Sequence, residues 1–312
     1  MRSELLYILS TKAGNGRAPQ LRDHLLQLSE KHDLDTQIQV VETEHEHHVY
    51  EAAREFAERA TDRPTADCTR VVYALGGDGT SNEVASALRG SRTALGIIPT
   101  GTANDFARQL YAEGTTIEDL LARSLSPSLT PIDLIELNDN ISLNVTSFGF
   151  DTVVLDEALR LLAKRPQLGK RAYTWAVLRT LHKPKTVYAS WELLDQYGKT
   201  IHGEGELTVA TIGNGGYYGG GYRPAPDAEL DDGLLDVSLV GKLKALEFPG
   251  LLLRYRKGKH TDHPQVQMAK VTEGVFRAAP GEVLLGNYDG IILREAELRF
   301  RVLPASILLA RI

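Results

Sequence analysis

Two short apolar runs that each end in a glycine-bearing turn constrain the fold of this chain more than any other feature. Val71 to Leu75 leads into the turn at residues 76–80, and Ala94 to Ile98 leads into a second turn at residues 99–102. Apolar runs of this length without polar alternation are typical of strands buried on both faces of a parallel sheet. A helical pattern follows each turn, so the sequence predicts two successive strand–turn–helix units.

The two turns predict a site for an anion. Glycine lets the backbone approach a ligand closely, and the free N–H groups and dipole of a helix start favour negative charge at the same place. We therefore expect phosphate where the turns face each other. A turn without any ligand is the alternative for residues 76–79 taken alone, because glycine marks many turns.

The residues around these turns resemble the catalytic domain of the diacylglycerol kinase family, in its bacterial soluble lipid-kinase branch. The resemblance rests on GGDGT at 76–80, NEV at 82–84 and GTANDFAR at 101–108. NAD kinases and phosphofructokinases share the first motif, whereas the third favours lipid kinases. The resemblance covers nearly the whole chain. It implies an ATP- and Mg²⁺-dependent lipid kinase that transfers the γ-phosphate to a lipid hydroxyl, with a diacylglycerol-like acceptor.

The length of 312 residues predicts two domains, because single cores rarely grow to this size. Strand and helix patterns alternate over residues 1–130, which predicts a nucleotide-binding α/β domain with a doubly wound parallel sheet. Over residues 131–303, turn dipeptides between alternating runs predict a β-rich, antiparallel, sandwich-like lipid-substrate domain with helical insertions. We expect residues 304–312 to return to the first domain.

The resemblance implies that several loops share the nucleotide. The loop after the first strand opens with Ser10-Thr11 where the family has Asn-Pro, and its backbone N–H groups could still hold phosphates. A solvated turn is the alternative there. Thr43 stands where the family has a nucleotide-contacting threonine. The expected nucleotide contacts are Ser10, Thr11, Lys12, Gly14, Thr43, Gly76, Gly77, Asp78, Gly79, Thr80, Asn82, Thr102, Asn104 and Asp105.

Two magnesium sites are implied by the same resemblance. Asp133 matches an aspartate that joins a water and Mg²⁺ network near the nucleotide, together with Asp78 and Asp105. A second, structural Mg²⁺ is implied at Glu229, Asp232 and Leu234, where a carboxylate and nearby carbonyls are suitable hard ligands. An ordinary hairpin turn is the alternative for the Asp-Asp-Gly sequence.

The run Glu-His-Glu-His-His at residues 44–48 looks like a metal cluster. We interpret it as the solvated first turn of a helix, because metal sites of this type need a second ligand group, which the sequence does not supply there.

One catalytic residue of the family is missing. The family carries Asp-Gly-Glu in a late strand, with the glutamate proposed as general base, but this chain reads Asp289-Gly290-Ile291. Ile291 cannot accept a proton, so we expect Asp78 and Asp289 to be the catalytic carboxylates. A weakened or non-catalytic nucleotide- and lipid-binding relative is the main alternative. A small-molecule kinase of the NAD type is the third, and the glycine-rich segment 213–221 argues against it.

Composition limits the possible partners. The net charge of −6 gives no reason to expect nucleic acid binding, and the single cysteine, Cys68, suits the reducing cytoplasm. No apolar run reaches about 18 residues, so we expect no transmembrane segment and a membrane lipid substrate met at the membrane surface. Basic clusters beside apolar stripes at 152–183 and 246–259 could hold the protein at the inner membrane face. The oligomeric state, a homodimer included, stays open.

Overall fold

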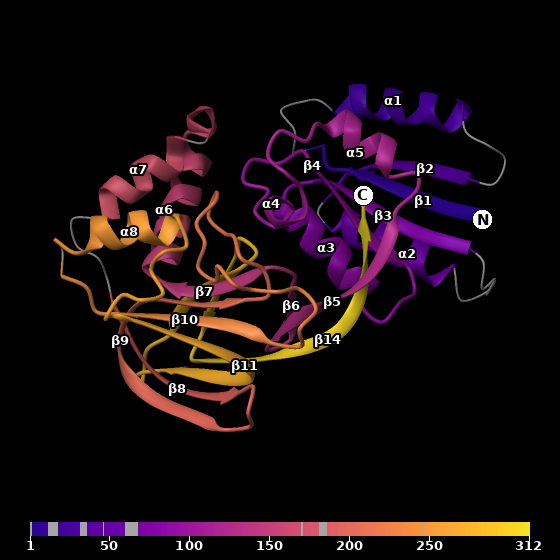
Figure 1. Ribbon diagram of the computed structural model, residues 1–312. Helices are drawn as coiled ribbons and strands as arrows, with labels where there is room; N and C mark the ends of the chain where they lie inside the picture. Colours follow the sequence, from indigo (N-terminus) through magenta and orange to yellow (C-terminus); the bar gives the residue numbers. More distant parts are fainter. Residues whose placement is uncertain are drawn as a thin grey trace. The chain divides into compact units, whose positions relative to one another are not determined.

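The computed structural model describes residues 2–11, 18–31, 36–45, 47–59, 68–169, 171–180, 186–244 and 246–312 (Figure 1). The chain divides into two compact units. The first comprises Met1–Leu134 and Pro304–Ile312, and the second comprises Ile135–Leu303.

The first unit is built on a parallel sheet in the order β4-β3-β1-β2. Its strands are β1 (Arg2–Leu9), β2 (Thr36–Glu42), β3 (Cys68–Gly76) and β4 (Ala94–Pro99). The central runs of β1 and β3 are buried on both faces, which explains their lack of polar alternation. The chain moves outward from β1 in both directions, so the strand order reverses between β1 and β3. Ligands of such sheets bind beyond the carboxyl ends of the strands at this point.

Helices cover both faces of this sheet, with α1 and α5 on one side and α2 and α3 on the other (Figure 1). The helices are α1 (Ala18–Lys31), α2 (His48–Glu58), α3 (Asp78–Leu88), α4 (Ala107–Leu110) and α5 (Ile117–Arg123). Tyr7 and Tyr73 stack within the buried core at a ring distance of 4.8 Å. Their hydroxyls bond to the Oγ and the carbonyl of Ser124 at 2.7 and 2.6 Å, so burying two tyrosines leaves neither hydroxyl unpaired.

Two strands belong to both units. β5 (Ser128–Leu137) and β14 (Glu297–Arg311) pair with each other, and the last part of β14 adds to the first unit's sheet in parallel with β4, with Leu308 opposite Ala94. Residues 304–312 therefore lie in the first unit, next to β4.

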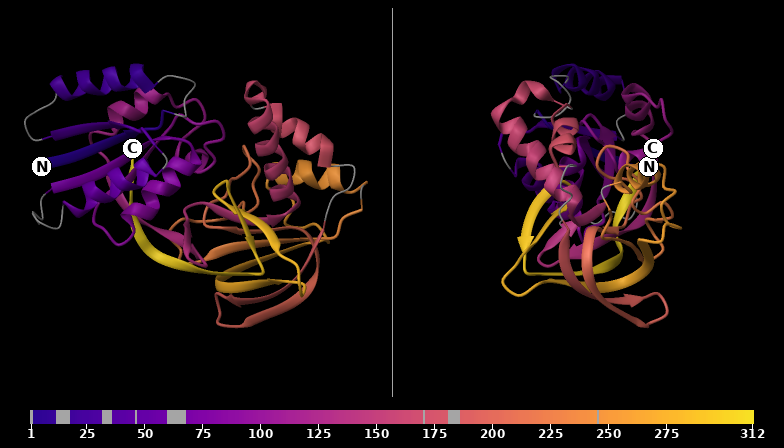
Figure 2. Two further views of the ribbon diagram at one scale, coloured as in Figure 1. Left: turned by 180° about the vertical axis from the view of Figure 1, so that it is seen from behind. Right: turned by 90° about the vertical axis from the view of Figure 1, so that its left-hand side faces the viewer.

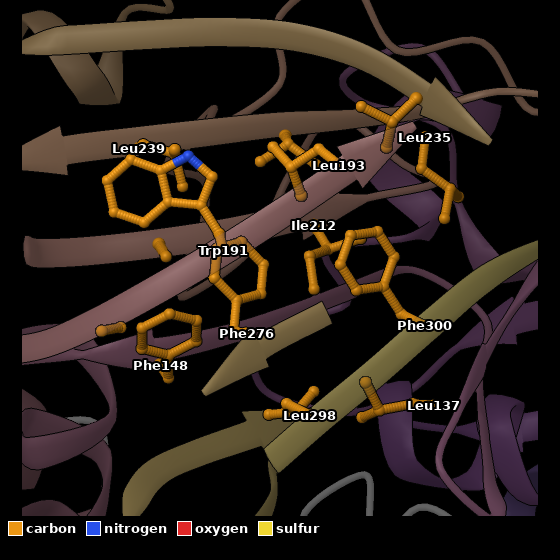
Figure 3. Packing of buried hydrophobic residues seen from close by; sticks show 14 of the residues in the cluster. Leu137, Phe148, Trp191, Leu193, Ile212, Leu235, Leu239, Phe276, Leu298 and Phe300 are labelled. Carbon is orange, nitrogen blue, oxygen red and sulfur yellow. The ribbon is translucent and has the colours of Figure 1, made fainter. Parts of the chain in front are cut away.

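The second unit is an antiparallel structure in two layers. Its own strands are β6 (Asn140–Ser142), β7 (Val145–Gly149), β8 (Val187–Asp195), β9 (Thr200–Gly213), β10 (Leu235–Gly241), β11 (Val266–Ala278), β12 (Leu284–Tyr288) and β13 (Ile291–Glu295). The long strands β9 and β11 each pair with β10 at one end and β8 at the other, so both pass between layers. Aromatic side chains fill the space between the layers, including Phe148, Trp191, Phe276 and Phe300 (Figure 3).

Three helices are inserted between these strands and gather at one end of the unit (Figure 2). They are α6 (Phe150–Lys164), α7 (Arg171–Thr180) and α8 (Phe248–Arg256), with a short 3₁₀ turn, η2, at Pro166–Leu168. The rings of Phe150 and Phe248 meet edge to face at 4.7 Å and join α6 to α8. The predicted fold class is confirmed: a doubly wound α/β unit and a β-rich unit with helical insertions.

Across the residues that the structure describes, no helix has the length and apolar content needed to cross a bilayer.

Candidate functional site

The carboxyl ends of β1, β2 and β3 are tied together at the point where the sheet reverses direction. Ser10 N–H donates to the Leu75 carbonyl at 2.9 Å, which joins the end of β1 to β3. Thr11 N–H donates to Thr43 Oγ1 at 3.1 Å, and Thr11 Oγ1 donates to the Thr43 carbonyl at 2.9 Å. The structure thus brings together three of the expected nucleotide contacts, Ser10, Thr11 and Thr43. Lys12 and Gly14 lie outside the described residues.

The two glycine turns are in direct contact. The N–H groups of Thr100 and Gly101 both donate to the Gly76 carbonyl, at 2.9 and 3.0 Å. A Cβ atom on Gly101 would lie 2.4 Å from the Cα of Gly77, so only glycine allows the turns to approach this closely. The turns at the ends of β3 and β4 therefore form one continuous backbone surface.

Gly79 has neither a packing nor a conformational reason to be glycine. It lies in the first turn of α3, and a Cβ atom placed on it would meet nothing within 4 Å. The N–H groups in the first turn of a helix have no partner within that helix. Gly79 leaves open space beside these N–H groups, which suits the oxygens of a phosphate, so the residues present suit the expected ligand.

Asn104 and Asp78 hold the second turn in place. Asn104 adopts a left-handed backbone with φ of 52°, and its Nδ2 donates to the Gly101 carbonyl at 2.9 Å. Asn104 Oδ1 is buried without a hydrogen-bond partner among the described residues. Asp78 Oδ1 accepts the Phe106 N–H at 3.2 Å, so this carboxylate links α3 to the second turn. Asn82 is buried within α3, whereas Thr80 packs against Gly76 and Thr102 is exposed.

The carboxylates expected near Mg²⁺ are each engaged by the protein. Asp133 is buried on β5 and accepts the Ala305 N–H at 2.8 Å, and Asp105 is buried with Arg108 Nε 3.4 Å from its Oδ1. Among the described residues, no group of three acidic, histidine or cysteine side chains could hold a metal ion. These carboxylates fit Mg²⁺ only through water and phosphate oxygens, which is how this ion usually binds.

The implied structural Mg²⁺ site already contains a positive side chain. Asp232 Oδ1 accepts the Leu234 N–H at 3.0 Å, and its Oδ2 lies 2.7 Å from Lys270 Nζ. The same ammonium lies 3.5 Å from Asp236 Oδ2. Burial alone would lower the pKa of Lys270, but its bonds to Asp232 and Asp236 raise it overall, so the ammonium stays charged. The set Glu229, Asp232 and Leu234, as arranged here, does not fit a bound metal ion.

The histidine-rich run at 44–48 shows no metal geometry in its described part. His48 Nδ1 accepts the Glu44 N–H at 3.0 Å, and the rings of His45 and His48 stack at 4.7 Å, while residue 46 lies outside the described ranges. α2 begins at His48, so the described part of the run precedes the helix except for its last residue and does not form the predicted first turn.

Asp289 has a structural role in the second unit. Its carboxylate accepts backbone N–H bonds from Leu143 at 2.7 Å, Asn144 at 3.2 Å and Val145 at 3.1 Å. Its own backbone is left-handed, with φ of 47°, in the turn between β12 and β13. Ile291, two residues later, is 41% exposed and brings no polar group to that position.

The sequence interpretation passed over Asp151, at the N-terminus of α6. Both of its carboxylate oxygens are buried without a hydrogen-bond partner among the described residues, and burial raises the pKa of the carboxyl. The available signal was limited to three hydroxyl-bearing residues, Ser147, Thr211 and Ser238, each adjacent to an apolar residue in its strand.

The fold defines a class of protein: an α/β unit with paired glycine turns at the reversal of its sheet, followed by an antiparallel sandwich. Two family patterns match these units, the "Diacylglycerol kinase catalytic domain" over residues 4–137 and the "YegS C-terminal NAD kinase beta sandwich-like domain" over residues 144–311. The chain belongs to the diacylglycerol kinase family, in the branch of YegS-like lipid kinases.

Similar proteins carry the same description. A Pectobacterium atrosepticum protein named "Probable lipid kinase YegS-like" is 32% identical over 76% of this chain and 76% of its own length. A Pseudomonas aeruginosa protein of the same name is 35% identical over 82% of this chain and 85% of its own length.

Solved structures share the fold. The crystal structure of a diacylglycerol kinase from Bacillus anthracis str. Sterne aligns with a TM-score of 0.68 at 20% identity, covering 99% of this chain and 97% of the other. A second structure from that organism gives a TM-score of 0.74 at 22% identity, covering 99% and 95%.

Proposed function

We propose that this protein is an ATP- and Mg²⁺-dependent lipid kinase that transfers the γ-phosphate to a lipid hydroxyl, with a diacylglycerol-like acceptor. The main support is the contact between the two glycine turns, where the Thr100 and Gly101 N–H groups bond to Gly76 and leave Gly79 facing open space. This arrangement suits a nucleotide phosphate better than any neutral ligand, because helix N-terminal N–H groups favour anions.

In this proposal the backbone binds and orients the phosphates. The first turn of α3, from Asp78 to Thr80, would donate N–H groups to phosphate oxygens, and the end of β1 at Ser10 and Thr11 would border the same ligand. The buried Oδ1 of Asn104 would accept a bond from a nucleotide hydroxyl or from a bound water.

The acidic residues of the first unit would position the metal's water ligands. Asp78, Asp105 and Asp133 would hold those waters. Magnesium, when bound, neutralises charge that develops on the β- and γ-phosphate oxygens. Asp289 is the only carboxylate of the late motif, and it would accept the acceptor's proton only by loosening its bonds to residues 143–145.

Exposed apolar side chains on two helices of the second unit suit a substrate held in a membrane. On α7, Trp175 and Leu178 are 54% and 60% exposed, and on α8, Leu253 is 64% exposed. Arg171 begins α7 and Arg256 ends α8, so positive charge accompanies these side chains. We propose that this surface, defined by Trp175, Leu178 and Leu253, contacts an anionic membrane.

The test is transfer of labelled γ-phosphate from ATP to a mixture of membrane lipids. The wild type should label a lipid alcohol in the presence of Mg²⁺, and Asp78→Ala should lower the rate by about 100-fold or more. Equal turnover by wild type and Asp78→Ala would contradict the proposed site. The labelled product would also identify the acceptor.

A second candidate function is binding of nucleotide or lipid without turnover. The exposed Ile291 favours it, because the family's proposed base is absent from that position. The labelling assay separates the two candidates when it is combined with an ATP-binding measurement: binding without labelling of any lipid would establish the second.

A further inference from the structure

Four polar side chains form a row across neighbouring strands of the second unit. Asn287 on β12 lies directly opposite Ser147 on β7, Ser147 lies opposite Thr211 on β9, and Thr211 lies opposite Ser238 on β10. All four are buried. Residues directly opposite each other point to the same face of a sheet, so the row forms a polar band on one face. The other face belongs to the apolar core, as Phe148 in Figure 3 illustrates.

The row is completely paired only at the Asn287 end. Asn287 Nδ2 donates to Ser147 Oγ at 2.8 Å and to Thr152 Oγ1, on α6, at 2.9 Å. At the other end, Thr211 Oγ1, Ser238 Oγ and the Tyr255 hydroxyl are buried and make no hydrogen bond with the described residues. Both carboxylate oxygens of Asp151 are likewise buried and make no hydrogen bond of good geometry with the described residues.

These unpaired groups surround one place. The Tyr255 hydroxyl, from α8, faces Thr211 and Ser238, and the Asp151 carboxyl, from the start of α6, faces Ser147 and Tyr218. The rings of Tyr218 and Tyr255 lie 6.4 Å apart. Buried polar groups are almost always hydrogen-bonded, yet these five atoms face one another without a hydrogen bond of good geometry, which leaves capacity for an occupant that supplies better bonds.

The ionisable side chains of the cluster favour their uncharged forms. Burial raises the pKa of the Asp151 carboxyl and of the Tyr218 and Tyr255 hydroxyls, so all three favour their protonated forms. The ring of His260 packs 4.1 Å from that of Tyr255, and burial lowers the pKa of this histidine, which favours its neutral form. Hydroxyls and a protonated carboxyl both donate and accept, which matches a hydroxyl-bearing neutral molecule and offers no cation to an anion.

Tyr218 borders this cluster through its contact with Asp151. The residue as a whole is partly exposed, its hydroxyl is buried, and the glycines at 219–221 follow it directly. Those three glycines have φ values of 60°, 82° and 104°, a conformation that side-chain-bearing residues rarely adopt.

We propose that Asp151, Tyr218, Tyr255, Thr211 and Ser238 bind a neutral, hydroxyl-bearing head group of the lipid acceptor, and that Asp151 selects a hydroxyl over an amine or a phosphate. This inference rests on the proposed function for its substrate, and it adds the residues that recognise the head group. It requires contacts within the second unit only.

The first experiment measures binding without nucleotide. Titration calorimetry with the water-soluble probe 1,2-dihexanoylglycerol would compare wild type, Asp151→Leu, Asp151→Asn and Thr211→Val. We expect Asp151→Leu to weaken binding by about 10-fold or more and Thr211→Val by about 3- to 10-fold, because each removes a bond from a buried site. Asp151→Asn keeps a neutral donor and acceptor and should change the dissociation constant by less than about 3-fold.

A matched control is available on the same strand as Ser147. Thr146 is buried, its hydroxyl is also unpaired, and it lies opposite Ile212 on the apolar face. Thr146→Val should leave probe binding unchanged. The proposal would be overturned if all variants had the wild-type melting temperature and bound the probe with wild-type affinity. A crystal soaked with the probe that showed only water in the cluster would also overturn it.

A second measurement separates this inference from the proposed function. In the kinase assay, Asp151→Leu should raise the KM for the lipid and leave the KM for ATP unchanged, and an unchanged lipid KM would overturn the subsite. A wild type that binds the probe but phosphorylates no lipid would overturn the proposed function and leave the subsite standing. If the wild type preferred a single-chain amino alcohol to the probe and Asp151→Asn lost that preference, Asp151 would be ionised. That result would overturn the assignment of a neutral carboxyl to Asp151.

Discussion

A substitution at Gly79 should affect protein stability and ligand binding in opposite directions. Its Cβ position is open, and its backbone is helical, so Gly79→Ala should raise the free energy of unfolding by about 0.5–1 kcal/mol. The added methyl group would occupy the space proposed for phosphate and lower kcat/KM for ATP by about 10- to 100-fold. Chemical denaturation and steady-state kinetics measure the two effects. Gly250→Ala, at an equally open position in α8, should leave the kinetics for ATP unchanged.

Asp151 should make stability depend on pH with a definite sign. Burial raises the pKa of this carboxyl in the folded protein, so its stabilising contribution is complete below the unfolded pKa of about 3.9 and is lost as pH rises through the folded value. Asp151→Asn cannot ionise. Its free energy of unfolding relative to wild type should therefore increase between pH 4 and pH 8 in urea titrations. A difference that stays constant over this range would show that the pKa is not raised.

The two possible roles of Asp289 can be separated with one substitution. Asp289→Asn would turn an amide N–H toward the backbone N–H groups of residues 143–145 and should lower the free energy of unfolding by about 1–3 kcal/mol. A role as base would also lower kcat by about 10²- to 10⁴-fold in the folded variant, with little change in KM. Asp139→Asn, an exposed acid in a neighbouring turn, is the control. Wild-type stability and wild-type kcat together would contradict both roles.

At the scale of elements, the ammonium group of Lys270 contacts Asp232, just before β10, at the place where a metal ion was expected. Lys270→Met would leave Asp232 and Asp236 together without a cation, and should lower the free energy of unfolding by about 1.5–3 kcal/mol. Added Mg²⁺ should restore part of this loss in the variant. Without nucleotide, a chelator should not change wild-type unfolding; a loss of stability on chelation would show that the wild type does hold a metal there.

The exposed pair formed by Lys242 and Glu206 provides the comparison for Lys270. Both side chains are largely solvated, so Lys242→Met should cost at most about 1 kcal/mol.

Features formed by residues close together in the sequence could be predicted, whereas contacts between residues far apart in the sequence could not. The strand, turn and helix around Gly76 could be predicted because apolar runs, glycines and helix starts are local signals. The place of Lys270 beside Asp232 could not, because 38 residues separate them and only the antiparallel pairing of β10 with β11 brings them together. The row from Asn287 to Ser238 was missed for the same reason, since four separate strands contribute one residue each.

At the scale of the molecule, the surface defined by Trp175, Leu178 and Leu253 should control binding to vesicles. Replacing Trp175 and Leu178 by Asp removes apolar area and adds negative charge, so sedimentation with anionic vesicles should recover at least about 10-fold less protein. Turnover of a detergent-solubilised lipid should stay near the wild-type value. Tyr197→Asp, at an 84% exposed tyrosine in the turn between β8 and β9, is the control for a general effect of surface charge.

The division of the chain into an α/β unit and a β-rich unit could be anticipated from the change in hydrophobic period near residue 131. The sequence also predicts the return of residues 304–312 to the first unit. It does not predict that β14 pairs with β11 before it pairs with β4, because both partners lie far away in the sequence.

That strand has a consequence for how the protein is made. Leu308 and Leu309 pair with β4 at the edge of a sheet whose other strands, β1 to β4, are all translated before residue 100. While the ribosome is still producing the second unit, β4 must wait with its outer backbone groups unpaired, and such an edge invites association with other nascent chains. The first unit can therefore reach its final form only after the second unit has been translated, so a strand made after that unit completes the sheet of the first.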